Sequence, residues 1–249
     1  MGSNVKVDAN ADIIKKCIDE VIKTNKISVL KSLQEKDVNR KYIYNEISLQ
    51  HELGIALRDK LSENYIVQFE RNITSFTEIS NLSKEDKKDI FKKSEIDIVI
   101  VNIKNSKERY AIELKYHKKE DGRIPNTMYD CIKDMYFAKA LVNKLNFCYS
   151  VCVTISEDKL FYSNDEKVTM RRKLQNYMYF EKDISKDDIE RRINNMKDKS
   201  KNVVYLSKNP VTLSIEDFYK DGIIPVKWDW IDKDDIEKGA YYLVEFFNK

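Results

Sequence analysis

The sequence contains little histidine and no closely paired cysteines. Its 249 residues include only two histidines, and none of the four cysteines forms a C-x-x-C pair. Structural zinc sites are usually built from such pairs together with histidine, so a zinc site is not expected. The cysteines are Cys17, Cys131, Cys148 and Cys152. We expect them to be reduced and mostly buried thiols in a cytoplasmic protein.

Long apolar runs and a strong net charge are also missing. No segment is apolar over the length that spans a membrane, and residues 1–11 lack the hydrophobic core of a signal peptide, so no membrane association is expected. Lysine and arginine total 45, aspartate and glutamate total 42, and the net charge is +3. Any surface that binds nucleic acid must therefore be local.

Repeats and low-complexity linkers are absent, which favours one continuous domain. A hydrophobic content of 42% is enough for a sizeable core at this length. We divide the chain into a helical lead-in at residues 1–40, a core at 41–160 and a C-terminal part at 161–249. The last part carries a charged helix and short strands, which we expect to pack on the same domain.

Residues 92–119 are the most informative stretch and predict a β-hairpin. Residues 95–101 and 110–116 alternate in polarity or are rich in β-branched and aromatic side chains, and a polar turn joins them at 102–109. The side chains of a strand alternate between its two faces. This alternation decides which polar residues of the hairpin can meet.

Polar side chains of the two strands can converge at one end of this hairpin. On the second strand, Glu113, Lys115 and His117 point away from the apolar face, with His117 at the exposed end of the strand. On the first strand, Asp97 shares its face with Glu95. Carboxylates are the ligands that hard cations such as Mg²⁺ prefer, and an ammonium beside the metal can orient a nucleophile. Hydrolysis of a phosphodiester is the natural use of this set.

The spacing of these residues resembles the signature of a nuclease superfamily. Asp97 is followed after sixteen residues by Glu113-Leu114-Lys115, which is similar to the D…(D/E)xK motif of the PD-(D/E)xK, or restriction-endonuclease-like, superfamily. The resemblance covers roughly residues 42–155, and no proline precedes Asp97. It implies an α/β fold with a mixed central β-sheet flanked by helices, an αβββαβ core and extra C-terminal strands.

The resemblance also implies roles for individual residues. Asp97 and Glu113 would hold Mg²⁺ or Mn²⁺, the backbone carbonyl of Leu114 would add a ligand, and Lys115 would assist the nucleophile. In many members a glutamate on the helix before the hairpin completes the metal site, which here is Glu46. The resemblance implies an endonuclease, and restriction, defence, repair and mobile-element roles stay open for it. The implied partner is nucleic acid, with DNA favoured, and a homodimer is left open. Apart from the resemblance, the high content of Lys, Ile and Asn indicates a bacterial source.

Glu46 has an unusual position for an acidic residue on the helix predicted at 41–61. Leu49, Leu53 and Leu57 form the apolar stripe of that helix, and Glu46 falls in the middle of it. A carboxylate directed at a core is costly unless it is paired or binds a metal. The alternative is a glutamate in the first helical turn, where the macrodipole favours its charge.

Further residues are weaker candidates for the same site. Gln50 lies one turn after the helix glutamate and can face the same cleft, whereas Glu52 lies off the stripe. Lys133 belongs to the helix predicted at 127–145, which in relatives often lends a residue to the cleft, and a surface lysine is the alternative. Tyr129 and Lys133 lie beside the apolar face of that helix, and Asp134 is expected at the opposite border of the same face. The second-rank candidates are Glu52, Gln50, Glu95, His117 and Lys133.

Basic residues near the hairpin and in the charged segment 165–200 are candidates for phosphate contacts. They are Lys92, Lys93, Lys118, Lys119, Arg171 and Arg172. A solvated or salt-bridged surface equally explains such charges. The other predicted elements are a helix within 12–33, strands at 65–73 and 146–155, a polar loop at 74–93, a helix near 186–196 and short strands after residue 203.

Two other interpretations of the charged residues stay open. The chain can be a nuclease-fold protein that binds nucleic acid and has lost catalysis. Alternatively, Asp97, Glu113 and Lys115 can simply form salt bridges on an exposed face of the sheet. Binding of Mg²⁺ or Mn²⁺ that depends on the carboxylates separates the nuclease from both.

Overall fold

A computed structural model describes residues 6–24, 43, 45–84, 87, 93–118, 124–158, 228–231 and 239–248. The helices are α1 (Ala11–Thr24), α2 (Glu46–Lys60) and α4 (Ile124–Leu145), with two short 3₁₀ helices, η2 (Ile73–Ser75) and η3 (Thr77–Asn81). The strands are β1 (Tyr65–Asn72), β2 (Glu95–Asn102), β3 (Arg109–His117), β4 (Tyr149–Ser156), β5 (Trp228–Trp230) and β6 (Ala240–Phe247). All of these strands belong to one sheet.

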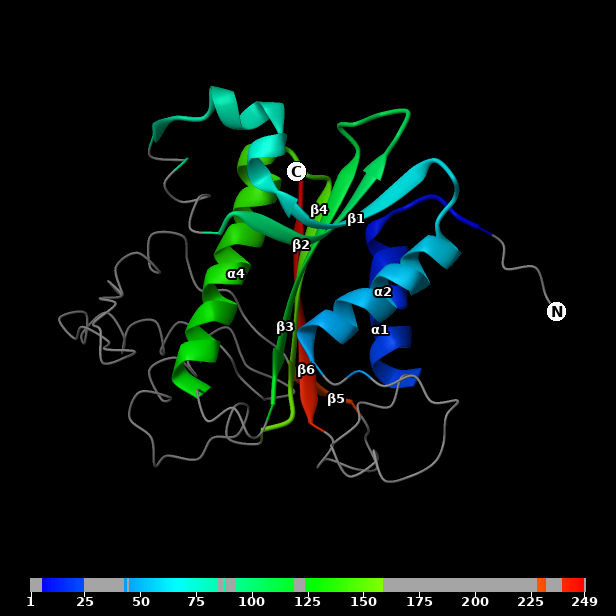
Figure 1. Ribbon diagram of the computed structural model, residues 1–249, viewed down its shortest axis with the longest axis vertical. Coiled ribbons are helices and arrows are strands. Elements are labelled where there is room, and N and C mark those ends of the chain that lie inside the picture. The colour runs from blue at the N-terminus through cyan, green and yellow to red at the C-terminus, as the bar shows by residue number, and fades with distance from the viewer. Residues whose placement is uncertain are drawn as a thin grey trace, which may run out of the picture.

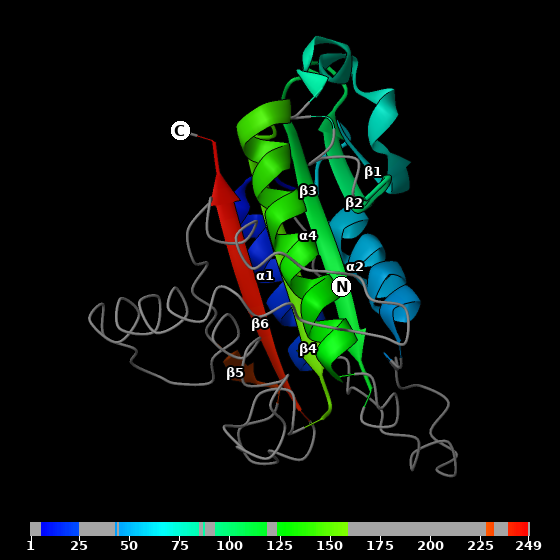
Figure 2. The ribbon, with the colours of Figure 1, turned by 90° about the vertical axis from the view of Figure 1, so that its left-hand side faces the viewer.

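The sheet is mixed and has the strand order β1-β2-β3-β4-β6-β5. Only β3 and β4 are parallel, and the other neighbouring pairs are antiparallel. Helices α1 and α2 cover one face of the sheet and α4 covers the other (Figure 1). Seen from the side of α4, this helix runs along β3 and β4 (Figure 2). The described part of the chain is therefore an α/β protein with a mixed central sheet flanked by helices, as the sequence predicted.

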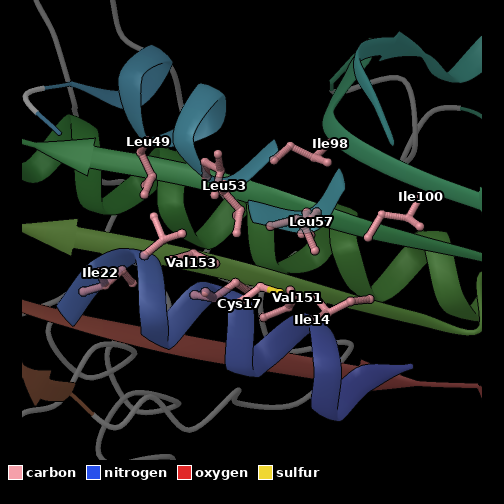
Figure 3. Close-up of a cluster of buried hydrophobic side chains, with 14 of the residues drawn as sticks. Ile14, Cys17, Ile22, Leu49, Leu53, Leu57, Ile98, Ile100, Val151 and Val153 are labelled. Carbon is pink, nitrogen blue, oxygen red and sulfur yellow. The ribbon is translucent and has the colours of Figure 1, made fainter. Parts of the chain in front are cut away.

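The larger apolar core lies between the sheet and the pair α1 and α2. The predicted stripe of Leu49, Leu53 and Leu57 points into it, opposite the strand residues Val151 and Val153 (Figure 3). All five side chains are almost completely buried. Helix α2 is thereby fixed on the sheet, with its first turn beside the end of β3.

Leu53→Ala should lower the free energy of unfolding by about 2–5 kcal/mol, because the truncation leaves a cavity under α2. The matched control is Ile47→Ala on the same helix, since Ile47 is 73% exposed while Leu53 is 0% exposed. This control should change the free energy of unfolding by less than about 0.5 kcal/mol. Urea denaturation followed by circular dichroism measures both values, and equal losses would contradict the packing of α2 on the sheet.

Helix α2 is shorter at its start than the predicted helix at 41–61. It begins at Glu46 because Asn45 is its N-cap: the Asn45 side chain accepts a hydrogen bond from the Ser48 amide, and the Ser48 side chain accepts one from the Asn45 amide. This reciprocal arrangement satisfies amide groups that have no partner inside the helix. Glu46 therefore occupies the first helical turn.

The other predicted elements are found with small shifts. Helix α4 starts at Ile124, before the predicted range 127–145, because a proline such as Pro125 is tolerated in a first helical turn. Asn146 has a φ of 55°, and this left-handed residue ends the helix, so β4 starts later than the strand predicted at 146–155. Strand β4 is buried along its whole length, as predicted.

The two terminal parts of the chain each contribute an element to this body. Helix α1, from the predicted lead-in, packs on α2, and β6, from the C-terminal part, pairs with β4. The helix predicted near 186–196 and the strands predicted from residue 203 to residue 227 lie outside the described residues. Cys17, Cys131 and Cys152 are buried free thiols, and Cys148 is a partly buried one. None of the described helices combines the length and apolarity needed to cross a membrane.

Candidate functional site

The candidate site lies where β2 and β3 stop pairing. Their ladder ends at the pair Ile98 and Ile112, whereas β3 continues to His117 and stays paired with β4 over that length. Residues 113–117 of β3 therefore have an edge without a strand partner among the described residues. Backbone amides on such an edge need other acceptors when they are buried.

Two carboxylates accept hydrogen bonds from this open edge. Asp97 Oδ2 lies 2.6 Å from the Leu114 amide nitrogen, and Glu46 Oε2 lies 3.3 Å from the Tyr116 amide nitrogen. Asp97 comes from β2 and Glu46 from the first turn of α2, where the helix dipole also favours a negative charge. The open edge thus brings together acids that are far apart in the sequence.

A lysine ammonium sits among three carboxylates beside this edge. Lys93 Nζ forms ion pairs with Asp97 Oδ1 at 3.2 Å, with Glu113 Oε2, and with Asp134 Oδ1 at 3.6 Å. The ammonium group of Lys93 therefore points into the site and is paired with acids, and its contact with phosphate stays a prediction. Its location makes it part of the candidate site.

A second lysine completes the group. Lys115 Nζ lies 3.2 Å from Glu46 Oε2 and 3.6 Å from Asp134 Oδ2. Asp134 therefore contacts both ammonium groups, one with each carboxylate oxygen. We call Glu46, Lys93, Asp97, Glu113, Lys115 and Asp134 the acid–lysine cluster.

Burial shapes the electrostatics of this cluster. Glu113 is 1% exposed, and burial together with the nearby charge of Asp97 raises its pKa well above the usual value, although Lys93 acts in the opposite direction. Burial likewise raises the pKa values of Asp134 and Glu46. Burial out of water disfavours the charged form of these carboxylates by more than the neighbouring lysines favour it.

The two ammonium groups show the opposite balance. Burial lowers the pKa of Lys93, but Glu113, Asp134 and Asp97 raise it by more, so the net direction is upward. Burial also lowers the pKa of Lys115, and Asp134 together with other neighbours reverses this effect. Both lysines therefore stay charged at neutral pH.

Gln50 joins the cluster from α2, as its position one turn after Glu46 predicted. Its side-chain nitrogen donates to the Asp97 backbone carbonyl at 2.7 Å and to Glu70 Oε1 at 2.5 Å. Glu70 has a φ of 47°, an uncommon conformation for a residue with a side chain. This kink lies on β1 directly beside the end of the β2–β3 ladder.

Other candidates lie away from the cluster. Glu95 is exposed at the start of β2, and Glu52 is partly exposed on α2. Lys133 Nζ pairs with Asp130 at 2.7 Å on the outer side of α4. The structure corrects the prediction for His117, which was expected at the exposed end of its strand: it is 1% exposed, its Nε2 lies 4.0 Å from Asp158 Oδ2, and β3 stays paired with β4 up to this residue.

The predicted phosphate contacts are only partly described. Lys118 follows β3 and is partly exposed. Lys92, Lys119, Arg171 and Arg172 lie outside the described residues. The prediction of a basic surface therefore stays a prediction.

Asp134 is the site residue to which the sequence interpretation gave no role. It was expected at the border of the apolar face of its helix, and it is 8% exposed and paired with both lysines of the cluster. A signal for this position exists: Asp134 follows Cys131 by three residues and precedes Ala138 by four, and both of these are buried. Residues three and four apart lie on one helical face, so Asp134 belongs to the apolar stripe.

The oxygen-rich character of the cluster fits a hard divalent cation. Four carboxylates surround two ammonium groups, so two negative charges are left over when all are ionised. Glu113 Oε1 and Asp134 Oδ2 accept no hydrogen bond from the residues that the structure describes. No three or more His, Cys, Asp or Glu side chains in the described part form a ready metal-binding group. Mg²⁺, however, is commonly held by one or two carboxylates together with water and phosphate. Asp97 and Glu113 can supply the two carboxylates.

Comparison of the chain with protein-family models, with curated proteins and with solved structures finds no significant match. The functional argument therefore depends on the residues and geometry of the acid–lysine cluster.

Proposed function

We propose that this protein is a Mg²⁺- or Mn²⁺-dependent nuclease that hydrolyses phosphodiester bonds, with DNA as the favoured substrate. The observation that carries the proposal is the meeting of Asp97, Glu113 and Lys115 with Glu46 at the open edge of β3. These residues come from three separate elements and share one cluster. An exposed salt bridge would not need the burial that Asp97 and Glu113 have.

The order of the elements supports a restriction-endonuclease-like core. Apart from the short 3₁₀ helices, α2, β1, β2, β3, α4 and β4 follow one another in the αβββαβ order that the resemblance implies. The E-x-K segment lies on β3, and Asp97 lies on the neighbouring β2. We therefore propose the finer fold assignment together with the activity.

Four residues of the cluster have a direct role in this proposal. Asp97 and Glu113 would hold the cation, and Lys115 would orient the attacking water and stabilise the negative charge that develops on the phosphate. The Glu46 carboxylate forms an ion pair with the Lys115 ammonium and fixes the position of that ammonium. When bound, the metal ion supplies positive charge that screens the phosphodiester and activates water.

Purified protein should cleave nucleic acid only when Mg²⁺ or Mn²⁺ is present, because the carboxylates alone repel the phosphate backbone. The assay offers plasmid, linear, branched and single-stranded DNA together with RNA, each with either ion and with EDTA. Removal of the ion should abolish cleavage. Cleavage that persists in EDTA, or no cleavage of any substrate with either ion, would contradict the proposal.

One observation favours a second function. Lys93 and Lys115 place positive charge among the acids, which suits a nuclease-fold protein that binds nucleic acid without cleaving it. Calorimetric titration with Mn²⁺ separates the two functions. Binding that is lost in Asp97→Asn supports the nuclease, and nucleic-acid binding without any Mn²⁺ binding supports the alternative.

A further inference from the structure

Lys93 has an unusual position for a residue that precedes a strand. It lies four residues before Asp97, and its side chain is only 25% exposed because its ammonium enters the acid–lysine cluster. Three carboxylates converge on it, from Asp97, Glu113 and Asp134. No other ammonium group in the described residues has so many acidic partners among the ion pairs found.

The contacts of Lys93 coincide with those proposed for the metal. Asp97 and Glu113 are the two acids that would hold a divalent cation, and both face Lys93 Nζ. Two positive charges cannot share these oxygens, since they would repel each other strongly inside a buried cluster. The ammonium therefore stands where the cation would stand.

We propose that Lys93 is a resident counter-ion of the site, which Mg²⁺ or Mn²⁺ must displace in order to bind, so that Lys93 sets how much metal the protein needs. This inference rests on the proposed nuclease function. It differs from a catalytic role, because Lys93 acts before the metal is bound.

Asp134 makes this displacement feasible. Its Oδ1 faces Lys93 while its Oδ2 faces Lys115. A lysine released from Asp97 and Glu113 can therefore stay beside Asp134 without being left unpaired. Glu113 Oε1, which has no hydrogen-bond partner among the described residues, offers a further oxygen to the incoming cation.

The test is calorimetric titration with Mn²⁺ of the full chain and of Lys93→Met, which keeps the length of the side chain and removes its charge. Lys93→Met should bind Mn²⁺ at least about tenfold more tightly, because the carboxylates lose their internal partner. Lys93→Arg, which keeps the charge, should not gain affinity. Lys15→Met is the matched control, because Lys15 pairs with Glu245 at 2.8 Å on β6 and is not part of the cluster.

Thermal unfolding gives a second measurement that does not depend on activity. In EDTA, Lys93→Met should unfold at a lower temperature than the unaltered protein, and saturating Mn²⁺ should remove most of that difference. Lys15→Met should not show this dependence on Mn²⁺. If Lys93→Met fails to fold without metal, Lys93→Gln, which keeps a hydrogen-bond donor, provides the same comparison.

The outcomes distinguish this inference from the proposed function. Equal Mn²⁺ affinities for the unaltered protein and Lys93→Met would overturn the role of Lys93 and leave the nuclease proposal standing. Tighter binding by Lys93→Met that disappears in the double variant with Asp97→Asn would support both. Absence of Mn²⁺ binding in every variant would overturn both.

Discussion

Asp97→Asn should slow metal-dependent cleavage by at least about a hundredfold while the protein remains folded. The reason is that the substitution removes one of two charged ligands proposed for the cation. The amide oxygen of asparagine can still accept the hydrogen bond that the Leu114 amide donates to Asp97. The open edge of β3 therefore keeps its acceptor, and the fold should survive.

Cleavage rates and Mn²⁺ affinity measured side by side test this expectation. The matched control is Asp59→Asn, because Asp59 is exposed near the other end of α2. Its rate should stay within about twofold of the unaltered protein, since it contacts none of the cluster residues. Near-normal cleavage by Asp97→Asn would remove Asp97 from the metal site and contradict the proposed mechanism.

Lys115→Met should also reduce cleavage by at least about a hundredfold, but for a different reason. The substitution removes the ammonium proposed to orient water and to stabilise the developing charge. It leaves Asp97 and Glu113 intact, so Mn²⁺ binding should be retained. Loss of the rate with retained metal affinity is the pattern that distinguishes Lys115 from a metal ligand.

The control for Lys115→Met is Lys16→Met, because Lys16 is a surface lysine that pairs only loosely with Glu20, at 3.9 Å. Circular dichroism should show the same secondary structure for both variants. A loss of Mn²⁺ binding in Lys115→Met would mean that Lys115 holds the cluster together and would contradict its assignment as a residue that acts on substrate. Unchanged cleavage in Lys115→Met would remove it from the mechanism altogether.

Alternation along the strands predicted correctly which side chains of β3 share a face. The rule that neighbouring side chains point to opposite faces placed Glu113 and Lys115 together, away from Leu114. Helical spacing placed Gln50 near Glu46. Local periodicity is readable from sequence because it depends on backbone geometry alone.

Contacts that depend on three-dimensional packing were not predictable in the same way. Lys93 lies in a polar segment, where the sequence carries no period that tells which way a side chain points. His117 was expected to be exposed because it ends its strand, but it is buried where β3 pairs with β4 and beside Asp158, both of which come later in the chain. The end of the β2–β3 ladder likewise follows from the twist and pairing of whole strands.

Helical periodicity could also have identified Asp134 as a site residue. The same argument that singled out Glu46 on the stripe of α2 applies to Asp134, which lies between Cys131 and Ala138 on the buried face of α4. A charged residue inside an apolar stripe is rare unless it has partners. Both acids proved to have lysine partners.

Two acids of the candidate site also stabilise the fold, because they satisfy backbone amides on the open edge of β3. Among the described residues no strand pairs with this edge, and Asp97 and Glu46 accept hydrogen bonds from the Leu114 and Tyr116 amides in its place. A mutation to alanine at either acid would therefore leave a backbone donor without its acceptor as well as remove a charge. Substitutions of these two acids should be retained during evolution less often than substitutions of an exposed acid such as Glu95. The reason is that each loss would also lower the stability of the protein.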